Sequence, residues 1–342
     1  MFRVFTVGED DITDEQWRGY FELHKELSER YDTPYSLVSW QTTRDRTLSR
    51  QSSERGNERA FILLDNQFAA WGGFNGRNIG TPGQAAFFMF DFIDQFTSPE
   101  LERAIIEPIG RWMDKYDLKE SFGVVNDAHR KQMAQRWGAK KLSRLDEYVL
   151  DRKSARQDKI EEWLTVTPRK HANLRLEFFQ LLPERLVEPF SELLVETLGD
   201  MPEEADGGLP FHATVQDERK LERWRQKNGL TLYKYLLFDQ GNELVAMTLV
   251  DVDLNNPANA FQQMTGITER YRGKGLAKWL KAAMYKKLGE DFPGSQRLIT
   301  SMRSKNEPMT AINDQMGFQL VRRGVEYKLT PEIVAQYLGR TE

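Results

Sequence analysis

The sequence predicts an α/β protein of the α+β type, with two tandem copies of one fold, each a mostly antiparallel mixed sheet flanked by helices. Three observations predict this. The chain has 342 residues, enough for two domains of about 100 to 200 residues. The predicted order of strands and helices in the first half recurs in the second. Phe2-Arg3-Val4 also resembles Leu174-Arg175-Leu176, and Asn126 with Gly138 has the same setting as Asn306 with Gly317.

The first domain is expected at residues 1–152, where alternating and helical patterns of apolar residues locate the elements. Strands are predicted at 2–7, 60–65, 67–73, 85–92, 120–125 and 142–150, and helices at 13–30, 44–55, 98–116 and 128–137. A charged stretch that ends in Thr165-Val166-Thr167-Pro168 follows the last strand. It indicates a helical connector at residues 153–170.

The second domain is expected at residues 171–342. Strands are predicted at 174–181, 231–238, 244–253, 261–268, 297–302 and 318–329, and helices at 184–198, 215–227, 273–288 and 307–316. Because this order repeats that of the first domain, both domains are predicted to share one topology.

The composition excludes several classes of function. The sequence has no cysteine, so disulfides, thiolate metal sites and thiol nucleophiles are absent. Its histidines never fall at a metal-ligand spacing, which predicts that no metal is bound. A net charge of −4, with acids and bases interspersed, argues against a nucleic-acid partner. No apolar run approaches the roughly 18 residues of a membrane helix, and the start lacks a secretory signal, so we expect a cytoplasmic protein.

The segment from Met264 to Ala277 carries the chemistry. An apolar strand ends at Ile267, a short basic loop follows, and Gly273 and Gly275 open a helix. Glycines let backbone N–H groups approach an anion, and the helix N-terminus adds unpaired donors and the positive end of a dipole. The segment therefore predicts a phosphate-binding loop.

Two known phosphate loops fail here on spacing. A Walker loop requires a hydroxyl residue at Gly275 and a glycine at Thr268. A dinucleotide-binding fingerprint requires a third glycine where Lys278 stands, and an alternating strand–helix unit instead of three consecutive strands. Neither pattern therefore describes this loop.

A third pattern is Arg or Gln, two residues, Gly, one residue, then Gly or Ala, and Arg270 to Gly275 matches it. The loop thereby resembles the pyrophosphate loop of the GNAT acetyltransferase superfamily. Downstream segments resemble that family's fifth strand and following helix: Ile299-Thr300-Ser301, Asn306, and Ala311-Ile312-Asn313 leading to Gly317-Phe318. Two GNAT-like domains in tandem resemble the mycothiol synthase branch, in which the C-terminal copy carries the chemistry.

The resemblance implies that the second domain binds acetyl-CoA as a co-substrate, in a cleft where its fourth strand splays from its fifth. The implied cofactor-binding residues lie at the strand end, in the loop and on the two following helices: Ile267, Arg270, Arg272, Gly273, Lys274, Gly275, Leu276, Ala277, Asn306 and Asn313. For Asn306 the sequence also supports a role as the N-cap of a helix that starts at Glu307.

The activity that the resemblance implies is transfer of an acetyl group to the amine of a small molecule, by direct attack of the amine on the thioester. The family frequently uses a tyrosine to protonate the departing thiolate, and Asn313 stands at that position here. Tyr327 is the candidate acid, with solvent as the alternative, and Asp251 is the candidate base. For Asp251 the alternative is a strand-end turn.

The first domain lacks the loop, and we expect a degenerate copy. Its fourth strand is followed by Phe92 to Pro99, without a glycine pair, and its Asp91 and Asp94 would repel a pyrophosphate. Two other functions stay open: a regulatory module that binds acyl-CoA without turnover, and a protein N-acetyltransferase. The acidic segment 203–206 suits a polyamine or an aminoglycoside but identifies no acceptor.

Overall fold

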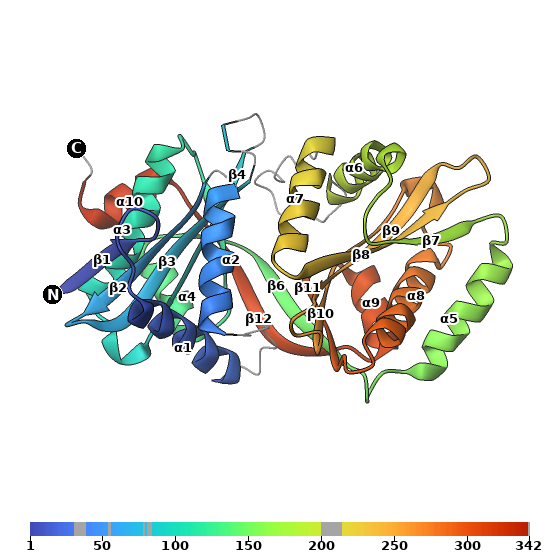
Figure 1. Ribbon diagram of the computed structural model, residues 1–342, viewed down its shortest axis with the longest axis horizontal. Coiled ribbons are helices and arrows are strands. Elements are labelled where there is room, and N and C mark those ends of the chain that lie inside the picture. The colour runs from blue at the N-terminus through green and yellow to red at the C-terminus, as the bar shows by residue number, and fades with distance from the viewer. Residues whose placement is uncertain (31–38, 54–55, 78, 81–83, 200–213, 341–342) are drawn as a thin grey trace. The chain divides into compact units, whose positions relative to one another are not determined.

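The computed structural model describes residues 1–30, 39–53, 56–77, 79–80, 84–199 and 214–340 (Figure 1). The acidic segment 203–206 lies outside the described residues. The chain forms two compact units: unit 1 comprises Met1–Leu145 and Arg323–Glu342, and unit 2 comprises Asp146–Arg322. In the part of the chain that the structure describes, no helix is both long enough and apolar enough to cross a bilayer.

Unit 1 is built on a sheet in the order β1-β2-β3-β4-β5-β12. Its neighbouring strands are antiparallel except for the parallel pair of β4 and β5. The strands are β1 (Phe2–Thr6), β2 (Asn57–Leu64), β3 (Gln67–Arg77), β4 (Ala85–Phe92), β5 (Ser121–Val125) and β12 (Gln319–Leu329).

Helices cover both faces of this sheet. On one face lie α1 (Asp14–Arg30) and α2 (Trp40–Ser53), and on the other α3 (Pro99–Lys115), α4 (Ala128–Arg136) and α10 (Pro331–Leu338). Helix α1 buries Trp17, Tyr20, Leu23 and Leu27, whose spacing of three or four residues places them on one stripe facing β2 and β3.

Unit 2 has a sheet in the order β6-β11-β10-β9-β8-β7, with β10 and β11 parallel. The strands are β6 (Lys140–Asp151), β7 (Arg175–Phe179), β8 (Leu230–Phe238), β9 (Leu244–Asp253), β10 (Asn259–Ile267) and β11 (Arg297–Arg303). Helices α6 (Glu184–Gly199) and α7 (Val215–Lys227) cover one face, whereas α5 (Gln157–Lys170), α8 (Leu276–Asp291) and α9 (Glu307–Met316) cover the other (Figure 1).

The predicted fold class is confirmed, because each unit has a mostly antiparallel mixed sheet with helices on both faces and both units repeat one order of elements. The compact units are nevertheless not the consecutive segments 1–152 and 171–342. Residues Val325 to Leu329 of β12 pair with β5 and so complete unit 1, while the second half of β6 belongs to unit 2. The connector helix α5 packs against α8 through Trp163 and is part of unit 2.

In unit 2 the parallel strands β10 and β11 pair only at their beginnings. The paired residues run from Asn259 with Arg297 to Gln262 with Thr300, and a bulge follows in β10 between Gln262 and Met264. Beyond the bulge, β10 pairs with β9 on one side only. The end of β10 therefore lacks a neighbouring strand on the side of β11, in line with the splayed fourth and fifth strands that the resemblance implied.

Candidate functional site

The glycine loop lies between β10 and α8. After β10 comes a single 3₁₀ turn, η2 (Glu269–Tyr271), followed by four residues that lead into α8. Gly273 and Gly275 have φ of 74° and 78°, in the left-handed region that glycine adopts without strain. A Cβ at Gly273 would meet nothing within 4 Å, so the backbone conformation, and not crowding, requires glycine there.

Five successive backbone N–H groups of this loop, those of residues 273–277, have no acceptor among the residues that the structure describes. The first helical bonds back to the loop come from Lys278 and Trp279, which both donate to the Gly275 carbonyl. Gly275 provides no side-chain cap, and the first turn of α8 has no acidic residue. An uncapped helix N-terminus of this kind favours an anion.

The basic side chains of the loop differ in their surroundings. Arg270 forms ion pairs with Glu243 and, at 3.6 Å, with Asp239, and the three residues are held on the surface. Arg272 is exposed and donates from Nε to the Ile267 carbonyl at 3.2 Å, so it closes the end of β10. Lys274 is exposed, with its Nζ 4.6 Å from the centre of the Tyr271 ring. Arg272 and Lys274 can therefore add positive charge next to the unbonded N–H groups.

Buried polar side chains gather where β10 and β11 stop pairing, on the face that α8 and α9 cover. Gln262 donates from Nε2 to Thr248 Oγ1 and to the Leu249 carbonyl, both at 2.9 Å. Thr300 Oγ1 donates to the Gln262 carbonyl at 3.2 Å. Lys281, from α8, reaches Gln262 Oε1 at 3.4 Å and is 1% exposed. Burial lowers the pKa of Lys281 to about 7.

The two asparagines that the sequence singled out lie at opposite ends of α9. Asn306 is the N-cap of α9, and its side chain accepts from the Met309 N–H at 3.3 Å. Asn313 is completely buried on the same face of the sheet as Lys281, with Nδ2 3.1 Å from Met302 Sδ. Its Oδ1 has no partner among the described residues. Asn306 therefore serves the helix, whereas Asn313 leaves a buried acceptor open.

The two predicted catalytic residues are held in other surroundings, one in an ion pair and one in the core of unit 1. Asp251, on β9, is paired with Arg225 of α7 at 3.2 Å and stands at the level of Phe261, roughly 13 Å along the strand from Thr265. Tyr327, on β12, belongs to unit 1, where it pairs with Gly123 of β5 and is 1% exposed within the core. Tyr327, the candidate acid, thus stands in unit 1 and not in a second domain at residues 171–342, where it was expected.

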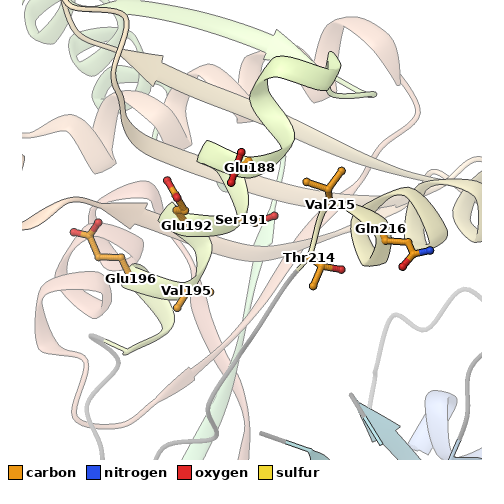
Figure 2. A pocket seen from close by; sticks show the side chains of 8 residues that line it. All are labelled: Glu188, Ser191, Glu192, Val195, Glu196, Thr214, Val215 and Gln216. Carbon is orange, nitrogen blue, oxygen red and sulfur yellow. The ribbon is translucent and has the colours of Figure 1, made fainter. Parts of the chain in front are cut away.

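A pocket of about 830 Å³ opens on the other face of unit 2, between α6 and the start of α7 (Figure 2). It is lined by Glu188, Ser191, Glu192, Val195, Glu196, Thr214, Val215 and Gln216. The three glutamates repeat every four residues along the exposed side of α6. The same helix meets the end of β10, since a Cβ on Gly266 would lie 2.4 Å from Thr197 Cγ2.

The sequence analysis did not predict Lys281 as a site residue, since lysines are frequent from Lys274 to Lys287 and most lysines of a helix are exposed. The available signal was local: Lys281 stands inside the apolar run from Trp279 to Met284, where a helix has no polar side. The glutamates of α6 were also missed, and their spacing of four residues was the signal.

Comparison with known proteins identifies the architecture. No protein-family model and no curated protein matches the chain. A tandem GNAT protein from the clavulanic acid biosynthesis pathway, solved without AcCoA, is 18% identical, with a TM-score of 0.75 over 97% of this chain and 99% of that one. A GCN5-related N-acetyltransferase from Sphaerobacter thermophilus is 11% identical, with a TM-score of 0.67 over 96% of each chain.

A third similar structure is a glucosamine N-acetyltransferase region in a fungal multi-domain GH3 β-N-acetylglucosaminidase. It is 8% identical, with a TM-score of 0.66 over 96% of this chain and 38% of that one. At such identities the likeness establishes the fold alone.

Proposed function

Because the chain has the fold of tandem GNAT proteins, we propose that it is an N-acetyltransferase whose unit 2 binds acetyl-CoA and transfers the acetyl group to a small-molecule amine. The observation that carries the proposal is the run of five backbone N–H groups without acceptors at residues 273–277. A pyrophosphate supplies the acceptors that these donors lack, and the dipole of α8 favours its charge.

The end of β10 would hold the thioester. Its backbone beyond Gln262 pairs with β9 only, so this segment has groups left for the pantetheine amides and the acetyl oxygen, apart from the Met264 and Ile267 carbonyls, which accept from Gln262 and Arg272. A neutral amine attacks the carbonyl carbon, and a backbone N–H on this strand stabilises the oxyanion. Binding both reactants at one strand end lowers the barrier by removing the cost of bringing them together.

The acceptor would enter from the pocket between α6 and α7. Glu188, Glu192 and Glu196 are exposed and have no cationic partner among the described residues. A row of unpaired carboxylates attracts cations and raises their local concentration. A pocket lined by carboxylates, on the helix that meets the end of β10, suits a small cationic amine and favours a small-molecule acceptor.

Titration calorimetry of acetyl-CoA tests the cofactor site. Gly273→Glu places a carboxylate where the pyrophosphate would lie, and we expect its affinity to fall at least a hundredfold. Gly339→Glu is the matched control, because Gly339 also has a positive φ, 68°, and nothing within 4 Å of a Cβ. Equal binding of acetyl-CoA by wild type and both variants would contradict a phosphate-binding loop at Gly273.

A transfer assay then tests the activity. Wild-type protein and acetyl-CoA are incubated with polyamines, aminoglycosides and aromatic amines, and release of free coenzyme A thiol is followed. We expect turnover with a cationic amine. Binding of acetyl-CoA without turnover on any amine would favour the regulatory module, and acetylation of peptides alone would favour a protein N-acetyltransferase.

A further inference from the structure

Lys281 is a buried cation without a counter-charge among the residues that the structure describes. Its Nζ has one long hydrogen bond, 3.4 Å to Gln262 Oε1, and lies 5.1 Å from the centre of the Phe318 ring. A lysine is almost never fully buried unless it is paired, because an unpaired ammonium is costly to desolvate. Lys234, equally buried in the same unit, pairs with Glu222 at 3.5 Å. The cost at Lys281 is not offset in this way, which points to a functional role.

The position of Lys281 connects the loop with the cleft. It lies five residues after Leu276, about 7.5 Å along the axis of α8 from the proposed pyrophosphate site. Its partner Gln262 pairs with Thr300 in the last parallel pair before the strands separate. A coenzyme A arm that runs from the start of α8 back along β10, from Ile267 toward Gln262, would therefore approach Lys281.

We propose that Lys281 is the acid that protonates the coenzyme A thiolate as the acetyl group leaves. The proposal rests on the proposed function. The amine nitrogen bonds to the carbonyl carbon, the C–S bond breaks, and its electron pair goes to sulfur. Sulfur takes a proton from the Lys281 ammonium. The nitrogen loses a proton to solvent as the amide forms, and neutral Lys281 regains one from solvent.

The acidity of Lys281 suits this step. Burial lowers its pKa to about 7, whereas a thiol has a pKa of about 8.5. Proton transfer from Lys281 to the thiolate is therefore downhill, but it would be uphill from an ordinary lysine with a pKa of about 10.4. Near neutral pH both forms of Lys281 are populated, so one group can donate and be recharged in each turnover.

Within the described part of the chain, no charged neighbour contributes to the lowered pKa of Lys281. The polar groups that β9, β10, β11 and α9 present on this face are uncharged: Thr248, Gln262, Thr300 and Asn313. On α8 itself, Lys278 donates to Gln315, and Tyr285 accepts from Gln157. Desolvation is the sole cause of the lowered pKa.

The first test needs no acceptor. Coenzyme A is bound to the wild type, to Lys281→Met and to the exposed control Lys286→Met, and the thiol is titrated through the ultraviolet absorbance of the thiolate. Lys281 and the thiol titrate as a coupled pair, so in wild type and control a fraction of the thiolate should already appear at the pKa of Lys281, about 7, whereas in Lys281→Met the thiolate should appear in one step at a higher pH. The same thiolate titration in all three proteins overturns the proposal.

The second test compares leaving groups. With acetyl-CoA, Lys281→Met should lose about a hundredfold in single-turnover rate while its affinity stays within threefold. With the acetyl selenoester of coenzyme A, whose selenolate leaves without a proton, the loss should shrink below tenfold. An equal loss with both esters means that Lys281 only fills the core.

Wild type alone provides a further check if Lys281→Met does not fold. Its rate should fall as pH rises through the pKa of Lys281 with the thioester but not with the selenoester, and a limb common to both esters refutes the acid role. If wild type binds no acetyl-CoA, the proposed function itself fails. If it binds and transfers while Lys281→Met behaves alike, only the role of Lys281 fails.

Discussion

The ends of strands β4 and β10 occupy equivalent positions in the two units. The helices that follow them differ in whether their first N–H groups are capped within the protein. The Ile93 N–H donates to the Ala69 carbonyl, just as the Thr268 N–H donates to the Val245 carbonyl. A 3₁₀ turn follows in each case, η1 (Asp94–Phe96) in unit 1 and η2 in unit 2. Phe92 therefore corresponds to Ile267, and the difference between the units begins directly after these turns.

The helices that follow start differently. In unit 1, the Ser98 side chain accepts from the Leu101 N–H, Pro99 has no N–H to offer, and Glu100 and Glu102 place acids in the first turn of α3. Helix α3 thus satisfies its own start and repels an anion. Helix α8 begins at Gly275 with neither a side-chain cap nor an acid, which leaves its donors for a ligand.

The strand end of unit 1 is also occupied from within. Arg130 of α4 donates from Nη2 to the Phe92 carbonyl at 2.7 Å and from Nε to Asp91 at 2.6 Å, and it pairs with Asp127 at 3.2 Å and Asp94 at 3.6 Å. Asp91 and Asp94, which we expected to repel a pyrophosphate, are thus held by arginine. A few residues at one strand end thus distinguish the two units. In unit 1 the polar groups there are bonded within the protein, whereas in unit 2 the N–H groups remain available to a ligand.

The largest effect is expected when Arg130 is removed from the end of β4 in unit 1. Arg130→Met leaves three partly buried aspartates without their common cation, so we expect the stability of unit 1 to fall by about 3 to 5 kcal/mol in urea unfolding. Arg111→Met, at an exposed arginine of α3, should change stability by less than about 0.5 kcal/mol. A gain of a second acetyl-CoA equivalent in Arg130→Met would show that Arg130 alone closes unit 1.

Lys281→Met should instead increase the stability of the folded protein. Because folding lowers the pKa of Lys281 to about 7, the native state binds fewer protons than the unfolded chain between pH 7 and about 10.4, and the penalty is complete below pH 7. We therefore expect the variant to be more stable than wild type by about 2 to 4 kcal/mol at pH 6, with a gain that shrinks at pH 9. A gain independent of pH would contradict a buried ammonium.

Substitutions at the two helix starts should cost similar stability but differ in binding. Ser98→Ala removes a cap and Gly275→Ala puts a side chain at a positive φ, so each should lower stability by about 1 kcal/mol. Only Gly275→Ala should weaken acetyl-CoA binding, by several fold in calorimetry. A comparable loss in Ser98→Ala would mean that α3 also contributes to the site.

The smallest effect is expected at Arg270. Its guanidinium is already paired with Glu243 and Asp239 on the surface, so Arg270→Ala should change acetyl-CoA affinity by less than threefold. Arg272→Ala, which frees the Ile267 carbonyl and removes a charge beside the unbonded N–H groups, should weaken it more. The reverse order in calorimetry would reassign the positive charge of the loop to Arg270.

Local patterns were sufficient to predict most of the fold. Apolar periodicity located the helices and strands of both units, and the glycine pair with its preceding strand located the loop. The partner of β12 could not be predicted, because nothing in residues 319–329 states which of two similar sheets the strand joins. Helix α10 was missed, although Thr330 caps it and Pro331 begins it in the usual way.

The candidate site was predictable only where backbone chemistry leaves a sequence signal. Gly273 and Gly275 indicate a backbone with positive φ. The burial of Lys281, in contrast, depends on how α8 packs against β10 and β11. Asp251 and Tyr327 were chosen by position along the chain, and neither an ion pair with Arg225 nor transfer of a strand to unit 1 can be read from neighbouring residues. The surroundings of Lys281, Asp251 and Tyr327 are therefore set by contacts between elements distant in the sequence, which local patterns do not predict.

The place of β12 in unit 1 imposes an order on biosynthesis. Strand β5 cannot pair with Val325 to Leu329 until those residues have been synthesised. The same holds for Arg103 of α3, which donates to the Leu338 carbonyl at 3.0 Å. The first unit to leave the ribosome is thus the last to be completed, after all of unit 2 has been translated. A gene cut between the two copies would therefore release an N-terminal product in which β5 is an open sheet edge, prone to pair with another chain.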